Sequence, residues 1–139
     1  SIQNKACLVI NVGTAVTIDM LSSKGDFIGG IILPGPSLMM QSLGEKTALI
    51  NAEPGKFEVL PVDTMSATYS GSIHALVGAI DRMQAILLNH IAEPCLLGHH
   101  IVSGGGASIL LPHLDSTVQH VKNLVLEGLV VMARDCENK

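Results

Sequence analysis

Two glycine-rich segments, far apart in the chain, carry residue types that can hold a phosphate group. The first is Gly13-Thr14-Ala15, which separates two runs of strand-like residues. Glycine lets the backbone approach an anion closely, and the N–H groups and threonine hydroxyl of such a turn can donate to its oxygens. Turns of this composition also occur with no ligand. The segment by itself therefore leaves both interpretations open.

The second segment is Ser103-Gly104-Gly105-Gly106-Ala107-Ser108, which lies between an apolar run and a short helical pattern. A glycine loop in this position offers close backbone approach and the positive end of a helix dipole. Its spacing matches neither the dinucleotide motif G-x-G-x-x-G nor the P-loop G-x-x-x-x-G-K-[ST]. A tight turn is the alternative. Two such loops in one chain favour a single nucleotide held between them.

Polar residues flank the first loop and open the longest helical pattern. Asn11 and Asp19 stand on either side of the loop. A carboxylate near a phosphate loop commonly orders Mg²⁺ or a water molecule, whereas a carboxamide offers only a neutral oxygen. For Asp19 the alternative is a strand-end residue bonded to backbone N–H groups. Thr64 has the position and residue type of a helix N-cap.

The remaining reactive residue types do not form a metal or hydrolase motif. We expect structural or solvent-exposed roles for all six histidines, because His99 and His100 would point to opposite faces of a strand. No serine or cysteine stands beside an obvious base. Cys7, Cys95 and Cys136 are odd in number and widely spaced, and no signal-peptide pattern opens the sequence. This cysteine usage predicts a reduced, cytoplasmic setting.

Composition narrows the class of protein further. The 139 residues, enough for one domain, are 47% hydrophobic and 14% charged, with a mean hydropathy of +0.46. No run reaches the roughly 18 uninterrupted apolar residues of a membrane span. The formal net charge is −4 and no Lys/Arg cluster occurs, so we do not expect nucleic-acid binding. The apolar excess predicts a surface buried against another domain or subunit.

Hydrophobic periodicity predicts the elements that position these residues. The expected elements are strands over 6–12, 16–22 and 27–33, a helix over 37–46 with Ser37 as N-cap, an irregular stretch over 51–63, a helix over 64–91, a strand over 99–103, a short helix from 107 that ends before Pro112, a strand over 118–121 and a helix over 124–136. This order predicts an α/β lobe of ribonuclease-H or actin type. Its mixed sheet would start as a three-stranded antiparallel meander, with helices on both faces.

The helix expected over 64–91 has two distinct faces. Large side chains recur at steps of three and four and predict the buried face; they are Met65, Tyr69, Ile73, Leu76, Ile80, Met83 and Leu87. A second line, the small-residue line, has almost no side-chain bulk and comprises Ala67, Gly71, Ala75, Gly78 and Ala85. Glycine inside a helix costs about 1 kcal/mol relative to alanine. Its two glycines therefore predict a close packing partner, either another backbone or the chain's own sheet.

Together these segments resemble the type III pantothenate kinases, the Baf-type members of the acetate-and-sugar-kinase/Hsp70/actin superfamily. Residues 9–19 look like the family's D-x-G-T-A-x-T-x-D motif, and residues 29–35 look like its G-G-x-I-x-P-G. The other matches are Leu43 with Thr47-Ala48-Leu49 to L-x-x-x-T-A-x-L, Asp63-Thr64 with Ser70-Gly71 to N-T…S-G, Ser103-Gly104-Gly105, and residues 124–129. The six matches occur in order and span nearly the whole chain.

The resemblance implies an enzyme that uses ATP with Mg²⁺ to phosphorylate pantothenate, the first step of coenzyme A synthesis. It implies ATP contacts at Gly13, Thr14, Ala15, Gly104, Gly105 and Gly106, and a pantothenate contact at Thr64. It also implies a monovalent cation, K⁺ or NH₄⁺, at position 11. The family has an aspartate there and this chain has Asn11, which keeps an oxygen ligand without the charge.

Part of the family pattern is not found in this sequence. The first phosphate motif, D-x-G-N, and the G-x-D-R segment with the catalytic aspartate are expected upstream of Ser1. Residues 1–139 thus resemble the C-terminal lobe of a two-lobe, homodimeric enzyme, without its N-terminal lobe, and the isolated chain is expected to be inactive. The alternatives are another kinase lobe of the same superfamily, or a non-catalytic relative that binds nucleotide or a regulatory partner.

Overall fold

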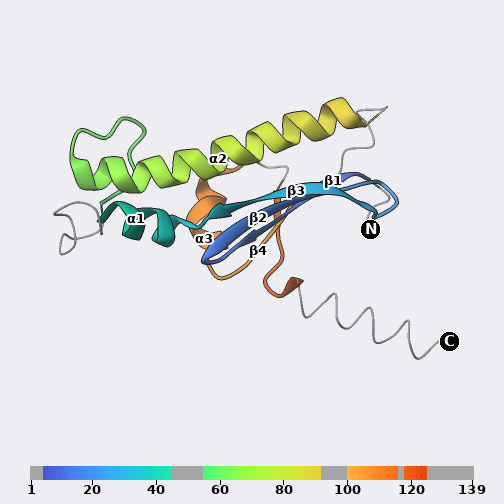
Figure 1. The fold of residues 1–139 in the computed structure, drawn as a ribbon, viewed down its shortest axis with the longest axis horizontal. Helices are drawn as coiled ribbons and strands as arrows, with labels where there is room; N and C mark the ends of the chain where they lie inside the picture. The colour runs from blue at the N-terminus through green and yellow to red at the C-terminus, as the bar shows by residue number, and fades with distance from the viewer. Residues whose placement is uncertain (1–4, 45–54, 92–99, 116–117, 125–139) are drawn as a thin grey trace.

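A long helix lies across one face of a five-stranded sheet in the computed structural model (Figure 1), which describes residues 5–44, 55–91, 100–115 and 118–124. The elements in chain order are β1 (Cys7–Val12), β2 (Ala15–Leu21), β3 (Phe27–Pro34), α1 (Pro36–Gly44), α2 (Thr64–His90), β4 (His100–Ser103), α3 (Ala107–Leu110), the 3₁₀ turn η2 (Leu111–His113) and β5 (Val118–His120). These agree with the expected elements to within one or two residues. The helix expected over 124–136 and the motif residues at 47–49 lie outside the described residues.

The strands are arranged in the order β3-β2-β1-β4-β5. β1, β2 and β3 form the antiparallel meander that the sequence predicted. β4 then joins β1 in parallel, and β5 joins β4 in parallel. This mixed sheet confirms the expected ribonuclease-H or actin-type lobe. It also brings the carboxyl ends of β1 and β4 to the same edge of the sheet.

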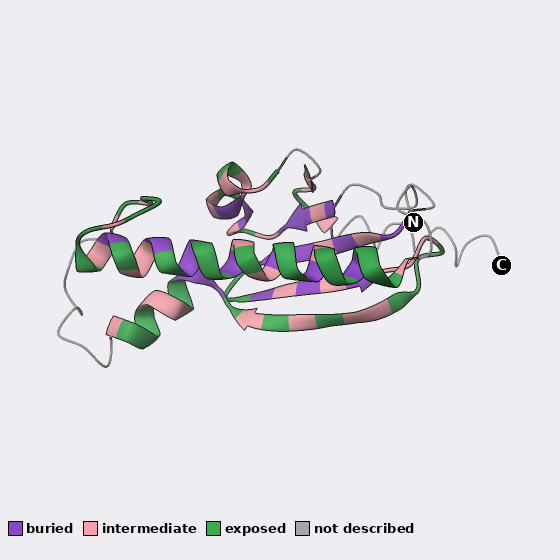
Figure 2. Cartoon of the chain, turned by 90° about the horizontal axis from the view of Figure 1, so that it is seen from above, coloured by how far each residue is buried: buried purple, intermediate pink, exposed green. Residues whose placement is uncertain are grey.

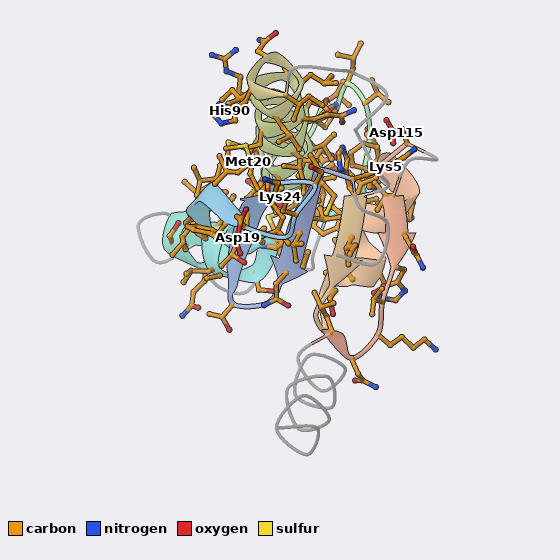
Figure 3. The ribbon with its side chains drawn as sticks, turned by 90° about the vertical axis from the view of Figure 1, so that its right-hand side faces the viewer. Lys5, Asp19, Met20, Lys24, His90 and Asp115 are labelled. Atoms are coloured by element: carbon orange, nitrogen blue, oxygen red, sulfur yellow. The ribbon has the colours of Figure 1, made fainter. Side chains whose placement is uncertain are left out.

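Alternation along the strands separates the two faces of the sheet. On the face that packs under α2, the side chains of β1 and β2 are buried; they are Leu8, Ile10, Val12, Val16, Ile18 and Met20. They pack against buried side chains of α2, which are Ile73, Leu76, Ile80, Met83 and Leu87. Figure 3 shows the alternation at two successive residues of β2, where Met20 points toward α2 and Asp19 points away from it.

The N-cap of α2 is Asp63, so the prediction that Thr64 caps this helix is wrong. The carboxylate of Asp63 accepts a hydrogen bond from the backbone N–H of Ser66 at 2.9 Å and satisfies one of the free donors of the first turn. Thr64 is the first helical residue, and its carbonyl accepts a bond from the Thr68 hydroxyl at 2.8 Å.

The start of α1 also differs from the prediction by one residue. Pro36 is its first residue, and the carbonyl of Gly35 accepts the backbone N–H of Met39 at 2.9 Å. Ser37 therefore lies inside the helix and is not its N-cap. Proline suits this first position because its missing N–H would have had no partner within the helix.

The small-residue line of α2 faces away from the sheet. All five of its residues are exposed, and Figure 2 shows this side of the helix as largely exposed along its length. A Cβ added at Gly71 or Gly78 would meet no atom within 4 Å. The chain's own sheet is therefore not the partner of these glycines, which leaves another backbone as the interpretation. None of the helices in the described ranges is long and apolar enough to span a bilayer.

The Asp63 cap predicts an acid-dependent contribution to stability. The hydrogen bond from the Ser66 backbone N–H lowers the pKa of Asp63 below its usual value. A carboxyl group with a lowered folded-state pKa stabilises the fold above its unfolded-state pKa, and this contribution is lost as the pH falls through the folded-state pKa. We expect Asp63→Ala to lower the Tm of the full-length protein at neutral pH and to weaken the decrease in Tm on acidification.

Asp63→Asn is the matched control, because asparagine caps helices well and does not titrate. It should keep most of the neutral-pH Tm while losing the same part of the acid dependence. Thermal unfolding followed by circular dichroism, from neutral pH to about pH 3, spans the usual aspartate titration range. An acid dependence that is identical in all three proteins would contradict this role for Asp63.

Candidate functional site

The two glycine segments lie side by side at one edge of the sheet. β1 and β4 are parallel neighbours in which Asn11 pairs with Ser103, so the turns that follow them leave from the same edge. The backbone N–H of Gly106 donates to the carbonyl of Val12 at 3.0 Å. The structure thus brings together the two segments that the sequence placed in one site.

This close approach requires glycine at position 104. Gly104 has a φ of +99°, in the left-handed region that side chains other than glycine rarely adopt. A Cβ at this position would also overlap the backbone of Val12. At Gly105, in contrast, a Cβ would meet no atom within 4 Å. The second loop can therefore lie on the end of β1 only because residue 104 has no side chain.

A third turn lies at this edge, and its packing against the first loop is not apparent from the sequence. Gly35, between β3 and α1, donates its N–H to the carbonyl of Thr14 at 2.7 Å. A Cβ at Gly35 would overlap the carbonyl oxygens of Gly13 and Thr14. In the sequence, the run Pro34-Gly35-Pro36 indicates that a strand ends there. It does not indicate which segment this turn packs against.

Both loops are accessible, but not every N–H in them is free to bind a ligand. Gly13, Thr14, Ala15 and Gly105 are exposed. The N–H of Gly13 donates to the Ala15 carbonyl at 3.0 Å, and the N–H of Gly106 is bonded to Val12. These two glycines therefore contribute close approach rather than N–H donors. The Thr14 hydroxyl makes no hydrogen bond within the described part of the chain, so it can donate to an anion.

The expected helix dipole contributes little at the second loop. α3 contains only four residues, and its N-cap is Gly106, which has no side chain to cap the helix. The macrodipole arises from aligned peptide units summed along a helix. A single turn provides few of them, so α3 adds little positive potential at this loop.

Three polar side chains form a row across the sheet at the level of the two loops. Asn11 in β1 pairs with Thr17 in β2 and with Ser103 in β4. Paired residues project from the same face, which here is the face opposite α2. Ser103 is only 4% exposed, Thr17 is half-buried and Asn11 is exposed. We call these three residues the polar row. Ser103 opens the second glycine segment and Thr17 follows the first, but their alignment with Asn11 depends on strand register, which is not visible in the sequence.

Asp19 lies on the same face as the polar row, two residues farther along β2 from the turn. It pairs with Val9 and with Gly30, and its carboxylate would overlap a Cβ at Gly30. The alternative of a strand-end residue bonded to backbone N–H groups is not observed in the described residues, since Asp19 is in the interior of the strand and makes no such bond there. Its carboxylate is therefore available on this face.

Thr64 lies on a different element from the glycine loops. It is exposed in the first turn of α2, and α2 packs against α1, which begins directly after Gly35 (Figure 1). The segment that leads into α2 is held by Phe57, whose ring lies 4.0 Å from the His113 ring and 5.3 Å from the His74 ring, centroid to centroid.

His100 and Cys7 lie in buried or half-buried structural surroundings, whereas His74, His90 and His120 are exposed. The buried His100 accepts the backbone N–H of Leu8 at its Nδ1, at 3.2 Å. Burial raises the pKa of the Cys7 thiol, which keeps it protonated and poorly nucleophilic. Within the described ranges, no group of three or more His, Cys, Asp or Glu side chains is arranged to hold a metal ion.

Gly104 and Gly105 form a matched pair for testing the contact between the loops. We expect Gly104→Ala to destabilise the full-length protein by about 1–3 kcal/mol, because a non-glycine residue is strained at positive φ. The overlap of its Cβ with the Val12 backbone should add to this loss. Gly105→Ala should leave the Tm nearly unchanged. Denaturant unfolding measures both variants, and equal stability of the two would contradict this description of the loop contact.

Comparisons with known proteins give matches to one family that together cover most of the chain. The model of the type III pantothenate kinase family matches residues 1–85. Curated type III pantothenate kinases from Nitrosospira multiformis and Nitrosomonas eutropha are 44% and 45% identical over 137 and 131 residues. The matches cover 96% and 94% of this chain but 50% and 51% of those proteins. The chain therefore spans about half the length of these relatives.

Solved structures agree on the fold. A Baf family transcriptional activator from Campylobacter jejuni superimposes with a TM-score of 0.69 at 21% identity, covering 97% of this chain and 60% of that one. The apo psk41 ParM protein gives a TM-score of 0.50 at 14% identity, covering 86% of this chain and 36% of that one. The structural neighbours support the fold alone, whereas the family match and the sequence identities go further: this chain belongs to the type III pantothenate kinase family.

Proposed function

We propose that residues 1–139 are the C-terminal lobe of a type III pantothenate kinase whose full-length form transfers the γ-phosphoryl group of ATP to the hydroxyl of pantothenate. The observation that carries this proposal is the meeting of two accessible glycine loops at one edge of an actin-like sheet. Family membership supports the substrate class. The reduced state expected from the cysteines supports a cytoplasmic location.

In this proposal the chain contributes to binding and orientation. Residues 13–15 and 104–106 would hold ATP, with the Thr14 hydroxyl donating to a phosphate oxygen, and Thr64 would contact pantothenate. Phosphoryl transfer depends mainly on positioning and on stabilisation of charge around the phosphates. The catalytic aspartate would come from the N-terminal lobe, so no catalytic residue is assigned within residues 1–139.

The donor set on this face fits a Mg²⁺ ion that arrives with ATP. Asp19 is the only acidic residue in the five described strands and faces the side of the polar row. Mg²⁺ commonly binds one or two carboxylates and takes its other ligands from phosphate oxygens and water. Asp19 would hold the ion directly or through a water molecule, and the ion would neutralise phosphate charge.

An assay of the full-length protein tests the proposed reaction. We expect phosphorylation of pantothenate that depends on ATP, followed as ADP release, and none by isolated residues 1–139. Thr14→Val should lower kcat by about 10²–10³-fold, the usual cost of removing one donor to a transition-state oxygen. Thr14→Ser keeps the hydroxyl and should retain most of the activity.

A panel of hydroxylated acids and sugars separates this function from its two alternatives. Turnover of another substrate in preference to pantothenate would support a different kinase of the superfamily. ATP binding without turnover of any substrate would support a non-catalytic relative. Full activity of Thr14→Val would show that the Thr14 hydroxyl does not contact the phosphate.

We also propose that the full-length protein is a homodimer that packs through the small-residue line of α2. Helices approach each other more closely where the side chains between them are small. Next to the start of α2 lie three apolar side chains, Val59, Leu60 and Val62, which are 71%, 85% and 96% exposed. Such exposure on an anchored segment is typical of an interaction surface.

Gly78 offers a matched pair of substitutions for the dimer. Gly78 is exposed and a Cβ there meets no atom within 4 Å, so alanine fits the protomer and we expect a leucine side chain to extend into solvent. We expect Gly78→Leu to shift the full-length protein toward monomer, because its bulk separates the two helices. Gly78→Ala should remain dimeric and gain about 1 kcal/mol of helix stability. Light scattering coupled to gel filtration gives the mass, and a Gly78→Leu dimer as tight as the wild type would contradict this interface.

A further inference from the structure

The polar row offers only neutral groups beside the two glycine loops. None of its three side chains makes a hydrogen bond to another described residue. The turns around it add glycines, Thr14 and Ala15, and no charged side chain. Ser103 is notable because its hydroxyl has no partner among the described residues although the residue is only 4% exposed. Unbonded polar groups of this kind are typically satisfied by a ligand or water.

The chemistry of the central residue determines what this row can bind. A carboxamide carries two N–H donors and a neutral oxygen, whereas a carboxylate can only accept hydrogen bonds. Asn11 is flanked by the hydroxyls of Thr17 and Ser103, which can also donate. An anion at the edge of the sheet therefore faces donors, and no negative charge on these three residues has to be offset.

The polar row lacks the negative charge that the family resemblance implies at position 11 beside a monovalent cation. A cation within the row would find three neutral oxygens, and the carboxylate on this face, Asp19, lies two residues farther along β2, where the proposed function assigns it to Mg²⁺. With aspartate at position 11, a cation would offset the repulsion between that carboxylate and a phosphate. Asn11 removes the repulsion, so the reason for placing a cation between the two is lost.

We propose that the carboxamide of Asn11 donates a hydrogen bond directly to a phosphate oxygen of the bound nucleotide, with no monovalent cation between them. The proposal rests on the proposed nucleotide site, and it concerns how that site binds its ligand. Strand register places Thr17 and Ser103 on either side of Asn11, at the level of the loops. Nucleotide affinity in this protein is accordingly insensitive to K⁺.

Binding measurements on the full-length protein test this directly. Calorimetric titration with ADP and Mg²⁺ is carried out in KCl, in NH₄Cl and in tetramethylammonium chloride, all at equal ionic strength. The wild-type Kd should be nearly the same in the three salts. Asn11→Asp should weaken binding in tetramethylammonium chloride by about tenfold, the scale of one charge-assisted hydrogen bond, and KCl should restore part of the loss.

Two further variants control for charge and for the loss of the donor. Asn89→Asp makes the same substitution at an exposed position of α2, which covers the opposite face of the sheet from the polar row. It should bind ADP like the wild type in all three salts. Asn11→Ala removes the donor without adding charge, so it should weaken binding by a similar factor in every salt. Thermal unfolding confirms that each variant is folded.

The outcomes separate this inference from the proposed function. A wild-type affinity that falls tenfold or more when K⁺ is replaced would overturn the direct contact while leaving the nucleotide site intact. If Asn11→Asp and Asn11→Ala both bind ADP like the wild type, the direct contact is likewise overturned and the nucleotide site is again left intact. Failure of the folded wild-type protein to bind ADP in any of the salts would overturn both proposals.

Discussion

The contact between Gly104 and the end of β1 is the constraint on which the site depends. Gly104 lies against the backbone of Val12, and Gly106 donates its N–H to the Val12 carbonyl. The parallel pairing of β1 with β4 brings the two turns to one edge, and the missing side chain lets them touch. Without this contact the two loops would remain separate turns, and the proposed nucleotide site would lack its second loop.

The register of the sheet places the core-forming residues on one face and the polar residues on the other. Residues of β1 and β2 that face α2 are buried and apolar, and they form the core. The residues between them face the other side, where Asn11, Thr17 and Ser103 align across three strands. Backbone hydrogen bonds between the strands fix this alignment. The same bonds therefore position both the polar residues and the core residues. The arrangement presents donors to a ligand without burying a charge.

The sequence predicted the elements well because their signals are local. Alternation in β2 and steps of three and four in α2 each result from one buried face. The cap of α2 was assigned to Thr64 rather than Asp63 because both are good capping residues at adjacent positions, and only the bond to Ser66 distinguishes them. The roles of Gly35, Thr17 and Ser103 depend on contacts between distant segments, which no local pattern encodes. Binding at Gly13–Ala15, Gly104–Gly106, Thr64 and Asn11 remains a prediction.

The ring contact between Phe57 and His113 has a mechanical consequence. η2, which contains His113, follows α3 directly, and α3 follows the second glycine loop. Phe57 belongs to the segment that runs into Asp63 and Thr64, and its ring lies 4.0 Å from the His113 ring, centroid to centroid, at a tilt of 43°. A shift of the loop that displaced α3 and η2 would therefore push on the segment before α2 through these two rings, and not through the strands. The two ends of that route are the residues assigned to different substrates.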